Sequence, residues 1–117
     1  MEKIRRIGES ARWADVLVYQ GIARWVEVAN DTSVGARAQL SQVFIQLDKT
    51  LQLVGSTRSQ LLEVTIFLSD LTFVPILNEL WDQWIDSNHP PIRACVQCGL
   101  QGNIMAEFVV HAAVGDG

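Results

Sequence analysis

Residues 89–114 read HPPIRACVQCGLQGNIMAEFVVHAAV, and this stretch predicts two strands joined by a polar loop. The strands are expected over Ile92–Cys98 and Ile104–Val114, because both segments are rich in apolar and β-branched residues, and GLQGN between them supplies turn residues. A strand that buries one face rarely carries a charge unless that charge is paired or used. We therefore expect Arg93 and Glu107, the charges inside these two strands, to mark the centre of a functional site.

The size and composition of the chain indicate one globular domain that spans residues 1–117. The chain has 117 residues, of which 49% are hydrophobic. This is enough for one hydrophobic core and too short for two domains of ordinary size. Its net charge of −4 argues mildly against a nucleic-acid partner, which usually requires a basic patch. No apolar run approaches the roughly 18 residues of a membrane span, and no apolar segment follows the N-terminal charges. We expect a cytoplasmic protein that binds neither membrane nor nucleic acid.

The two cysteines, Cys95 and Cys98, have the spacing of a redox pair or of half a zinc site. A redox pair sits at a helix N-terminus, whereas these cysteines lie at the end of an expected strand. Residues three apart in a strand point to opposite faces, so the two sulfurs would not easily share one metal ion. We expect one cysteine in the core and the other beside a pocket, with no metal and no cofactor.

The rest of the chain predicts further elements from its apolar periodicity and its turn residues. They are an irregular segment or edge strand over residues 1–12, a hairpin of Asp15–Tyr19 and Ala23–Val28, a helix that follows the potential caps of residues 30–33 and runs to Val54, a strand at Leu61–Leu68, and a helix from about Asp70–Thr72 to about Ser87. Gly55 is placed to end the first helix in a left-handed conformation. In the hairpin, Glu27 is expected on the same face as Trp25.

The order β-β-α-β-α-β-β favours crossover connections, with both helices on one face of a sheet. The other face then needs cover, and association of several copies would supply it. Two sets of apolar strand residues predict sheet surface that two helices would leave open. They are Val16, Val18 and Trp25 in the hairpin and Ile104, Ala106, Phe108 and Val110 in the last strand.

The chain resembles the YjgF/RidA family, also called endoribonuclease L-PSP or translation inhibitors, over nearly its whole length. The resemblance is carried by Trp13, Gln39, the segment TIFLSD at Thr65–Asp70, Asn78, Trp81 and the motif Pro91–Val96 (PIRACV), with Glu107 fourteen residues after Arg93. It implies a chorismate-mutase-like α+β domain, a β-sheet with two helices packed on one face. It also implies that three copies form a barrel-like homotrimer with sites in the clefts between subunits.

The resemblance further implies an activity without a cofactor, the hydrolysis of reactive 2-imino or enamino acids to 2-oxo acids and ammonia. By this resemblance Arg93 binds the substrate carboxylate, Glu107 orients the attacking water, and Cys95 belongs to the catalytic neighbourhood beside Arg93. Trp13 would cover the pocket where many members have tyrosine. The residue chemistry agrees, because a guanidinium grips a carboxylate with two parallel hydrogen bonds and a placed carboxylate can move a proton from water.

One departure from the family concerns the end of the second hairpin strand. Most members have a Ser/Thr-Gly pair where this chain has Val26-Glu27. Glu27 could fill the pocket, pair with Arg93 or repel a carboxylate substrate. Two functions therefore stay open, an imine deaminase and a non-catalytic homotrimer that binds a small carboxylate or a protein partner. A nuclease is disfavoured, because the chain is acidic and has no stripe of basic and aromatic residues.

Overall fold

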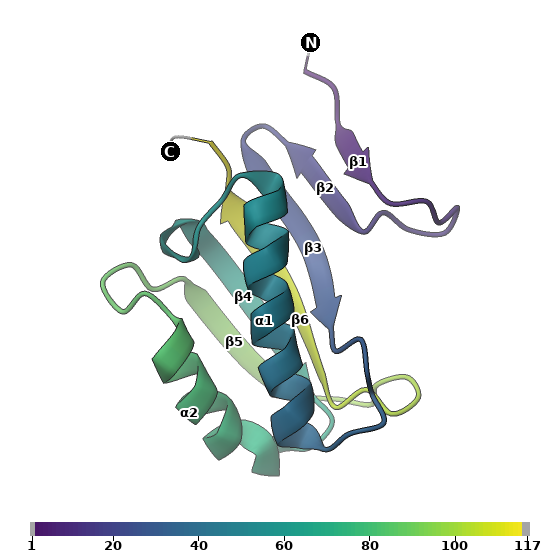
Figure 1. Cartoon of the computed structure of the whole chain (residues 1–117), viewed down its shortest axis with the longest axis vertical. Coiled ribbons are helices and arrows are strands. Elements are labelled where there is room, and N and C mark those ends of the chain that lie inside the picture. The colour runs from purple at the N-terminus through teal and green to yellow at the C-terminus, as the bar shows by residue number, and fades with distance from the viewer. Residues whose placement is uncertain (1, 116–117) are drawn as a thin grey trace.

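The computed structural model describes residues 2–115, which form a six-stranded sheet with two α-helices on one face (Figure 1). The strands are β1 (Arg5–Ile7), β2 (Val16–Tyr19), β3 (Ile22–Val28), β4 (Leu61–Leu68), β5 (Ile92–Gln97) and β6 (Ala106–Ala113), and the helices are α1 (Ala36–Val54) and α2 (Val74–Trp84). The strand order is β1-β2-β3-β6-β4-β5. This arrangement confirms the α+β class and the packing of both helices on one face.

The hairpin of β2 and β3 ends before β3 does. Gln20 and Gly21 form the turn with φ angles of 52° and 73°, as a two-residue hairpin turn of the type with two positive φ angles requires. The last pair of the hairpin is Val16 with Trp25, while β3 continues to Val28. Beyond Trp25, β3 pairs only with β6 among the described residues, so its other backbone edge is open there.

Strand β6 lies in the middle of the sheet and pairs antiparallel with β3 and β4. The edge strand β5 pairs parallel with β4, and α2 makes the crossover between them, as predicted. The β5 and β6 bounds are slightly shorter than expected, because Cys98, Ile104, Met105 and Val114 lie outside the two strands.

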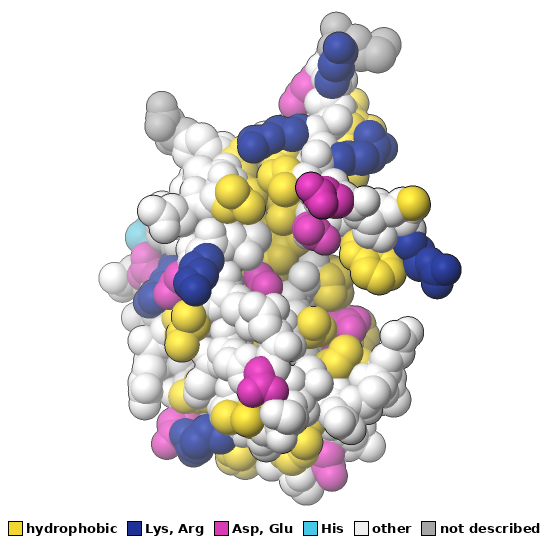
Figure 2. All heavy atoms as spheres, turned by 45° about the vertical axis from the view of Figure 1, so that its right-hand side comes forward, with side chains coloured by type: hydrophobic (Ala, Val, Ile, Leu, Met, Phe, Trp, Pro, Cys, Tyr) yellow, Lys and Arg dark blue, Asp and Glu magenta, His cyan; other side chains and the backbone are white. Residues whose placement is uncertain are grey.

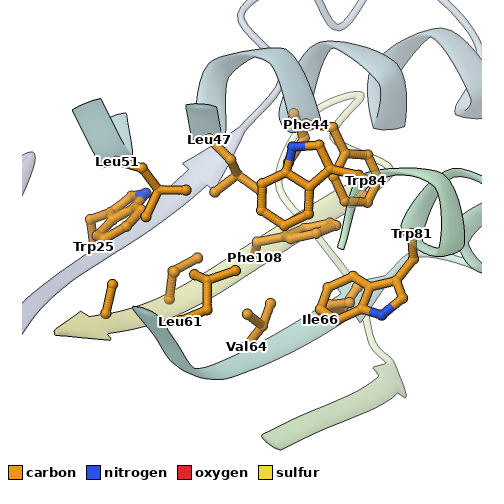
Figure 3. Close-up of a cluster of buried hydrophobic side chains, with 14 of the residues drawn as sticks. Trp25, Phe44, Leu47, Leu51, Leu61, Val64, Ile66, Trp81, Trp84 and Phe108 are labelled. Carbon is orange, nitrogen blue, oxygen red and sulfur yellow. The ribbon is translucent and has the colours of Figure 1, made fainter. Parts of the chain in front are cut away.

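The core lies between the sheet and the two helices (Figure 3). The apolar stripe of α1 faces the sheet, and its Phe44 ring packs against Phe108 of β6 with ring centroids 5.6 Å apart and an angle of 89°. Trp84 of α2 also packs against Phe44, with ring centroids 5.2 Å apart. Trp81 and Trp84, three residues apart on α2, are both buried and belong to this core.

The predicted open apolar face was assigned mostly to the wrong residues. Val16 and Trp25, together with Ala106, Phe108 and Val110, are buried in the core. The reason is that alternate residues of a strand point to opposite faces, and these residues belong to the helix-covered set. The face without helices instead presents Val26, Ile92 and Val96, which are 54%, 69% and 43% exposed.

The ends of the helices differ partly from the sequence prediction. α1 begins at Ala36, after an N-cap at Gly35, and Asp31 instead accepts hydrogen bonds from Ser33 within the preceding loop. Gly55 ends α1 with φ 76°, as predicted. A short 3₁₀ turn, η2 (Leu71–Phe73), precedes α2, whose first turn contains a proline. No helix in the described part of the chain is long and apolar enough to cross a membrane.

Candidate functional site

A cavity of about 640 Å³ lies beside the open edge of β3, where β2 has ended. Figure 2 shows a hollow on this side of the molecule, with hydrophobic and acidic side chains around it. The cavity is lined by Trp13, Ala14, Asp15, Trp25, Val26, Glu27, Val28, Asn30, Thr50, Ile104 and Glu107. It therefore joins residues from the segment before β2, the end of β3, α1, the segment before β6 and β6 itself.

Glu107 reaches the cavity from the face of the sheet that carries no helix. Its neighbours Ala106 and Phe108 are buried in the core, so the alternation of the strand turns Glu107 the other way. The side chain is half-buried, and in residues 2–115 it makes no side-chain hydrogen bond and no ion pair. A carboxylate held in a half-buried position without an internal partner is available to a ligand or to a bound water.

Gln39 positions the segment that leads into β6. Its side chain is fully buried, and its amide nitrogen donates to the carbonyl oxygens of Val34 and Asn103 at 3.0 Å each and of Thr32 at 3.3 Å. The Met105 N–H donates to the Gln39 side-chain oxygen at 3.0 Å. The start of α1 is thereby tied to the backbone on both sides of Ile104, which lines the cavity. The sequence signal was an amide next to the apolar stripe of α1, and only the resemblance had singled it out.

Glu27 lies on the helix-covered face with Trp25, as predicted, and α1 fixes its carboxylate. One carboxylate oxygen accepts from Trp25 Nε1 at 3.0 Å and from Thr50 Oγ1 at 2.9 Å, and the other accepts from Gln46 Nε2 at 3.2 Å. Glu27 does not pair with Arg93 within residues 2–115, which was one of its three expected roles. Glu27 instead forms part of the cavity wall.

Trp13 stands at the edge of the cavity and is 63% exposed. The segment that carries it begins at Gly8, whose φ of 121° favours glycine. A Cβ at that position would lie 2.8 Å from Asp15 Cγ, so the close approach also requires glycine. The Asp15 N–H donates to the Ile7 carbonyl at 2.7 Å and closes the segment. Trp13 thus borders the cavity, and its role as a cover stays a prediction.

Arg93 lies on β5, half-buried on the helix-covered side. Its Nη2 donates to Asn78 Oδ1 at 2.8 Å, and its guanidinium carbon lies 5.1 Å from the ring centroid of Trp81. Both contacts come from α2, and Arg93 makes no ion pair within residues 2–115. The guanidinium is thus oriented by an amide and an aromatic ring, and its remaining N–H donors can bind a carboxylate.

Cys95 shares the face of Arg93, because residues two apart in a strand point to the same side, and it packs against the core. Burial raises the pKa of the Cys95 thiol, and the nearby charge of Arg93 opposes this only in part. The thiol is therefore protonated at neutral pH and is a poor nucleophile. Cys95 and Cys98 are both free thiols. No group of three or more His, Cys, Asp or Glu side chains in residues 2–115 is arranged to hold a metal ion.

The chain therefore brings together three of the five predicted site residues. Trp13, Glu27 and Glu107 line one cavity, whereas Arg93 and Cys95 lie on the opposite face of the sheet from Glu107, with β4 between β5 and β6. Sequence reasoning also missed Thr50 and Gln46, which hold Glu27, since nothing in the sequence shows that these positions of α1 face the end of β3.

Comparison with known proteins gives the family. The model of the family described as endoribonuclease L-PSP matches residues 13–114. The chain belongs to the endoribonuclease L-PSP family. One relative is the RutC family protein YoaB of Escherichia coli K12. It is 34% identical to this chain over 112 residues, which cover 95% of this chain and 98% of YoaB.

Solved structures support the same family and fold. An uncharacterized protein from Pseudomonas aeruginosa has a TM-score of 0.91 and 32% identity, over 97% of this chain and 100% of that one. A member of the YjgF family from Neisseria meningitidis has a TM-score of 0.90 and 26% identity, over 98% of each chain. The L-PSP family chain therefore has the YjgF-type fold expected from its sequence.

Proposed function

We propose that the chain is a cofactor-free deaminase that hydrolyses 2-imino and enamino acids to 2-oxo acids and ammonia. The proposal rests on one observation above all, that Arg93 and Glu107 are half-buried charges without an ion-pair partner in residues 2–115. Half-buried charges of structural use are normally paired, so unpaired ones indicate a ligand. Family membership adds the resemblance of the Pro91–Val96 motif to that of active relatives.

The proposed chemistry requires only water and two charged side chains. Arg93 binds the carboxylate of the imino acid through two parallel hydrogen bonds. Glu107 accepts a proton from water as the water oxygen bonds to the imine carbon, and it delivers that proton toward the nitrogen. In the resulting carbinolamine, Glu107 transfers the hydroxyl proton to the nitrogen as the carbonyl forms and the carbon–nitrogen bond breaks, so that one imine and one water give one 2-oxo acid and one ammonia. Trp13 shields the reacting carbon from bulk solvent.

The proposed active form is a homotrimer in the cytoplasm. Within one chain Arg93 and Glu107 lie on opposite faces of the sheet, so a site that uses both needs a second copy. The face without helices carries exposed apolar residues, including Ile92 at 69% exposure, that association would cover. We propose that three copies join through this face, with the β5 edge of one beside the cavity of the next.

The test generates 2-iminopropionate from alanine with an amino-acid oxidase and follows its decay. The wild-type chain is expected to accelerate the decay, while Arg93→Ala and Glu107→Gln should abolish the acceleration. Arg37→Ala is the matched control, because Arg37 is an exposed arginine of α1 outside the cavity. A wild-type rate equal to that of Arg93→Ala would refute the deaminase proposal.

Glu27 favours a second candidate, a non-catalytic member that binds a small carboxylate or a protein partner. Its carboxylate occupies the cavity wall at the place where the resemblance implies a Ser/Thr-Gly pair. If this anion excludes carboxylates, Glu27→Gly should bind pyruvate more tightly than the wild type does, as measured by calorimetry. The second candidate also predicts that the wild type does not turn over 2-iminopropionate. Unchanged affinity would count against the second candidate. RNA cleavage is not proposed, because no lysine or arginine lines the cavity to meet a phosphate.

A further inference from the structure

The cavity has a one-sided chemistry. Asp15, Glu27 and Glu107 contribute carboxylates to its wall, Trp13 and Trp25 contribute aromatic rings, and no lysine, arginine or histidine belongs to the lining. Such a wall attracts a positive group and repels a negative one.

Glu27 is the carboxylate that is held in a fixed orientation. Its three hydrogen-bond donors, Trp25 Nε1, Thr50 Oγ1 and Gln46 Nε2, are all uncharged. Hydrogen bonds from neutral donors orient a carboxylate without cancelling its charge, and within residues 2–115 Glu27 has no ion pair. A carboxylate has about four acceptor positions, so about one remains free for a donor in the cavity. The charge and this free position are therefore both available to a ligand.

Trp13 adds an exposed aromatic surface to the same cavity. The face of an indole attracts a guanidinium or ammonium group placed within about 6 Å of the ring. Elsewhere in this chain indoles already have this role, since Arg58 lies 5.0 Å from the ring centroid of Trp84 and Arg93 lies 5.1 Å from that of Trp81. An indole that is 63% exposed and lines the same cavity as an uncompensated carboxylate offers a cation both an aromatic surface and a counter-charge.

We infer that Glu27 is a specificity residue that selects substrates with a positively charged side chain, a guanidinium or a primary ammonium. This inference rests on the proposed function, because it assigns the two ends of an imino acid. Arg93 of a second copy takes the carboxylate, and the cationic end of the side chain lies against Glu27 and Trp13. Substrates with an acidic side chain are repelled by the same wall.

The test compares two imino acids that differ only in this charge. An amino-acid oxidase produces the 2-imino acids of arginine and of citrulline, in which an uncharged urea group replaces the guanidinium at the same chain length. The wild type should favour the arginine product about tenfold in kcat/KM, which corresponds to about 1.4 kcal/mol. In Glu27→Gln, which keeps the shape and one acceptor oxygen, this preference should fall to within about twofold.

Asp82→Asn is the matched control, because it removes one negative charge from an exposed position of α2 outside the cavity and should keep the wild-type preference. Thermal unfolding of Glu27→Gln shows whether the variant is folded. Equal turnover of the two imino acids by the wild type would overturn the inference and leave the deaminase proposal intact.

A binding measurement separates the inference from catalysis. Calorimetry with arginine and with citrulline, neither of which can be hydrolysed at an imine, should show tighter binding of arginine by the wild type and no difference in Glu27→Gln. If no imine is turned over but this pattern holds, the charge selection by Glu27 stands and the deaminase proposal fails. If the wild type neither turns over an imine nor binds arginine, both the inference and the deaminase proposal are overturned.

Discussion

Arg93 and Glu107 lie on opposite faces of the sheet, on strands that β4 separates. Arg93 points toward α2, where Asn78 and Trp81 hold it, while Glu107 borders the cavity at the open edge of β3. Two residues in this relationship cannot act on one small substrate within a single chain. We therefore expect a neighbouring copy to supply the missing half of the proposed site.

Two inactive variants should restore each other's activity when they are mixed. Arg93→Ala retains Glu107, and Glu107→Gln retains Arg93. An interface is therefore intact when an Arg93→Ala subunit supplies the cavity and a Glu107→Gln subunit supplies the arginine, and in the reverse order both residues are lost. If equal amounts are co-expressed and assemble at random in a cyclic trimer, about one quarter of the sites are intact. The deaminase rate of the purified mixture should therefore approach about one quarter of the wild-type rate. A mixture as inactive as its components would mean that Arg93 and Glu107 do not form one site across an interface.

Asn78 is expected to position Arg93 for the substrate carboxylate. Asn78→Ala removes the 2.8 Å hydrogen bond and should raise KM about fivefold with little change in kcat, because a net hydrogen bond contributes about 1 kcal/mol. Asn78→Asp should raise KM further, since an ion pair with Arg93 would compete with the substrate. Asn88→Ala, at an exposed position after α2, is the control. Steady-state kinetics that show a fall in kcat alone would contradict this role.

Gln39 is expected to stabilise the fold through the hydrogen bonds of its buried side chain to four backbone groups. Gln39→Met preserves the volume of the side chain but removes its four hydrogen bonds. The free energy of unfolding should fall by about 3 kcal/mol, because buried polar groups would lose their partner. Gln52→Met, at an exposed position of the same helix, should change it by less than about 0.5 kcal/mol. Urea denaturation measures both, and similar values for the two would disprove the assignment.

Gly8 is expected to fix the segment that carries Trp13. Gly8→Ala places a Cβ 2.8 Å from Asp15 Cγ at a φ of 121°, so the variant should lose about 2 kcal/mol of stability. Gly99→Ala is the matched control, since a Cβ there meets nothing within 4 Å. The fluorescence of Trp13 is obtained by subtracting the spectrum of the corresponding Trp13→Phe protein, which removes the signal of the other tryptophans. This difference spectrum should shift in Gly8→Ala and not in Gly99→Ala. An unshifted spectrum would mean that Trp13 keeps its place without Gly8.

Local patterns in the sequence predicted the elements well. The strand Leu61–Leu68 has the predicted bounds, and α1 ends before Gly55 as its apolar stripe and glycine indicate. These features depend on residues close together in the chain, so the sequence contains the information directly. Period-two alternation also placed Cys95 with Arg93 and Glu27 with Trp25 on shared faces.

Relations between distant elements could not be predicted in the same way. The alternation of β6 leaves undecided which of its faces the helices cover, and Phe108 was accordingly expected on the open side, although it is fully buried. The partners of Glu27 on α1 depend on how the helix lies across β3, which no local pattern encodes. The order of the strands, which separates Arg93 from Glu107, likewise results from pairing across the whole chain.

The hydrogen bonds around Glu27 also constrain how this cavity can change during evolution. Glycine or serine at position 27 would leave the Trp25 indole and the Thr50 and Gln46 side chains without their common acceptor. A lineage that exchanges the glutamate is therefore expected to exchange residues at positions 25, 46 and 50 as well, so that the four positions are inherited as a set. Subfamilies with different ligands should then be distinguishable by this set, even when the arginine and glutamate of the proposed reaction are the same.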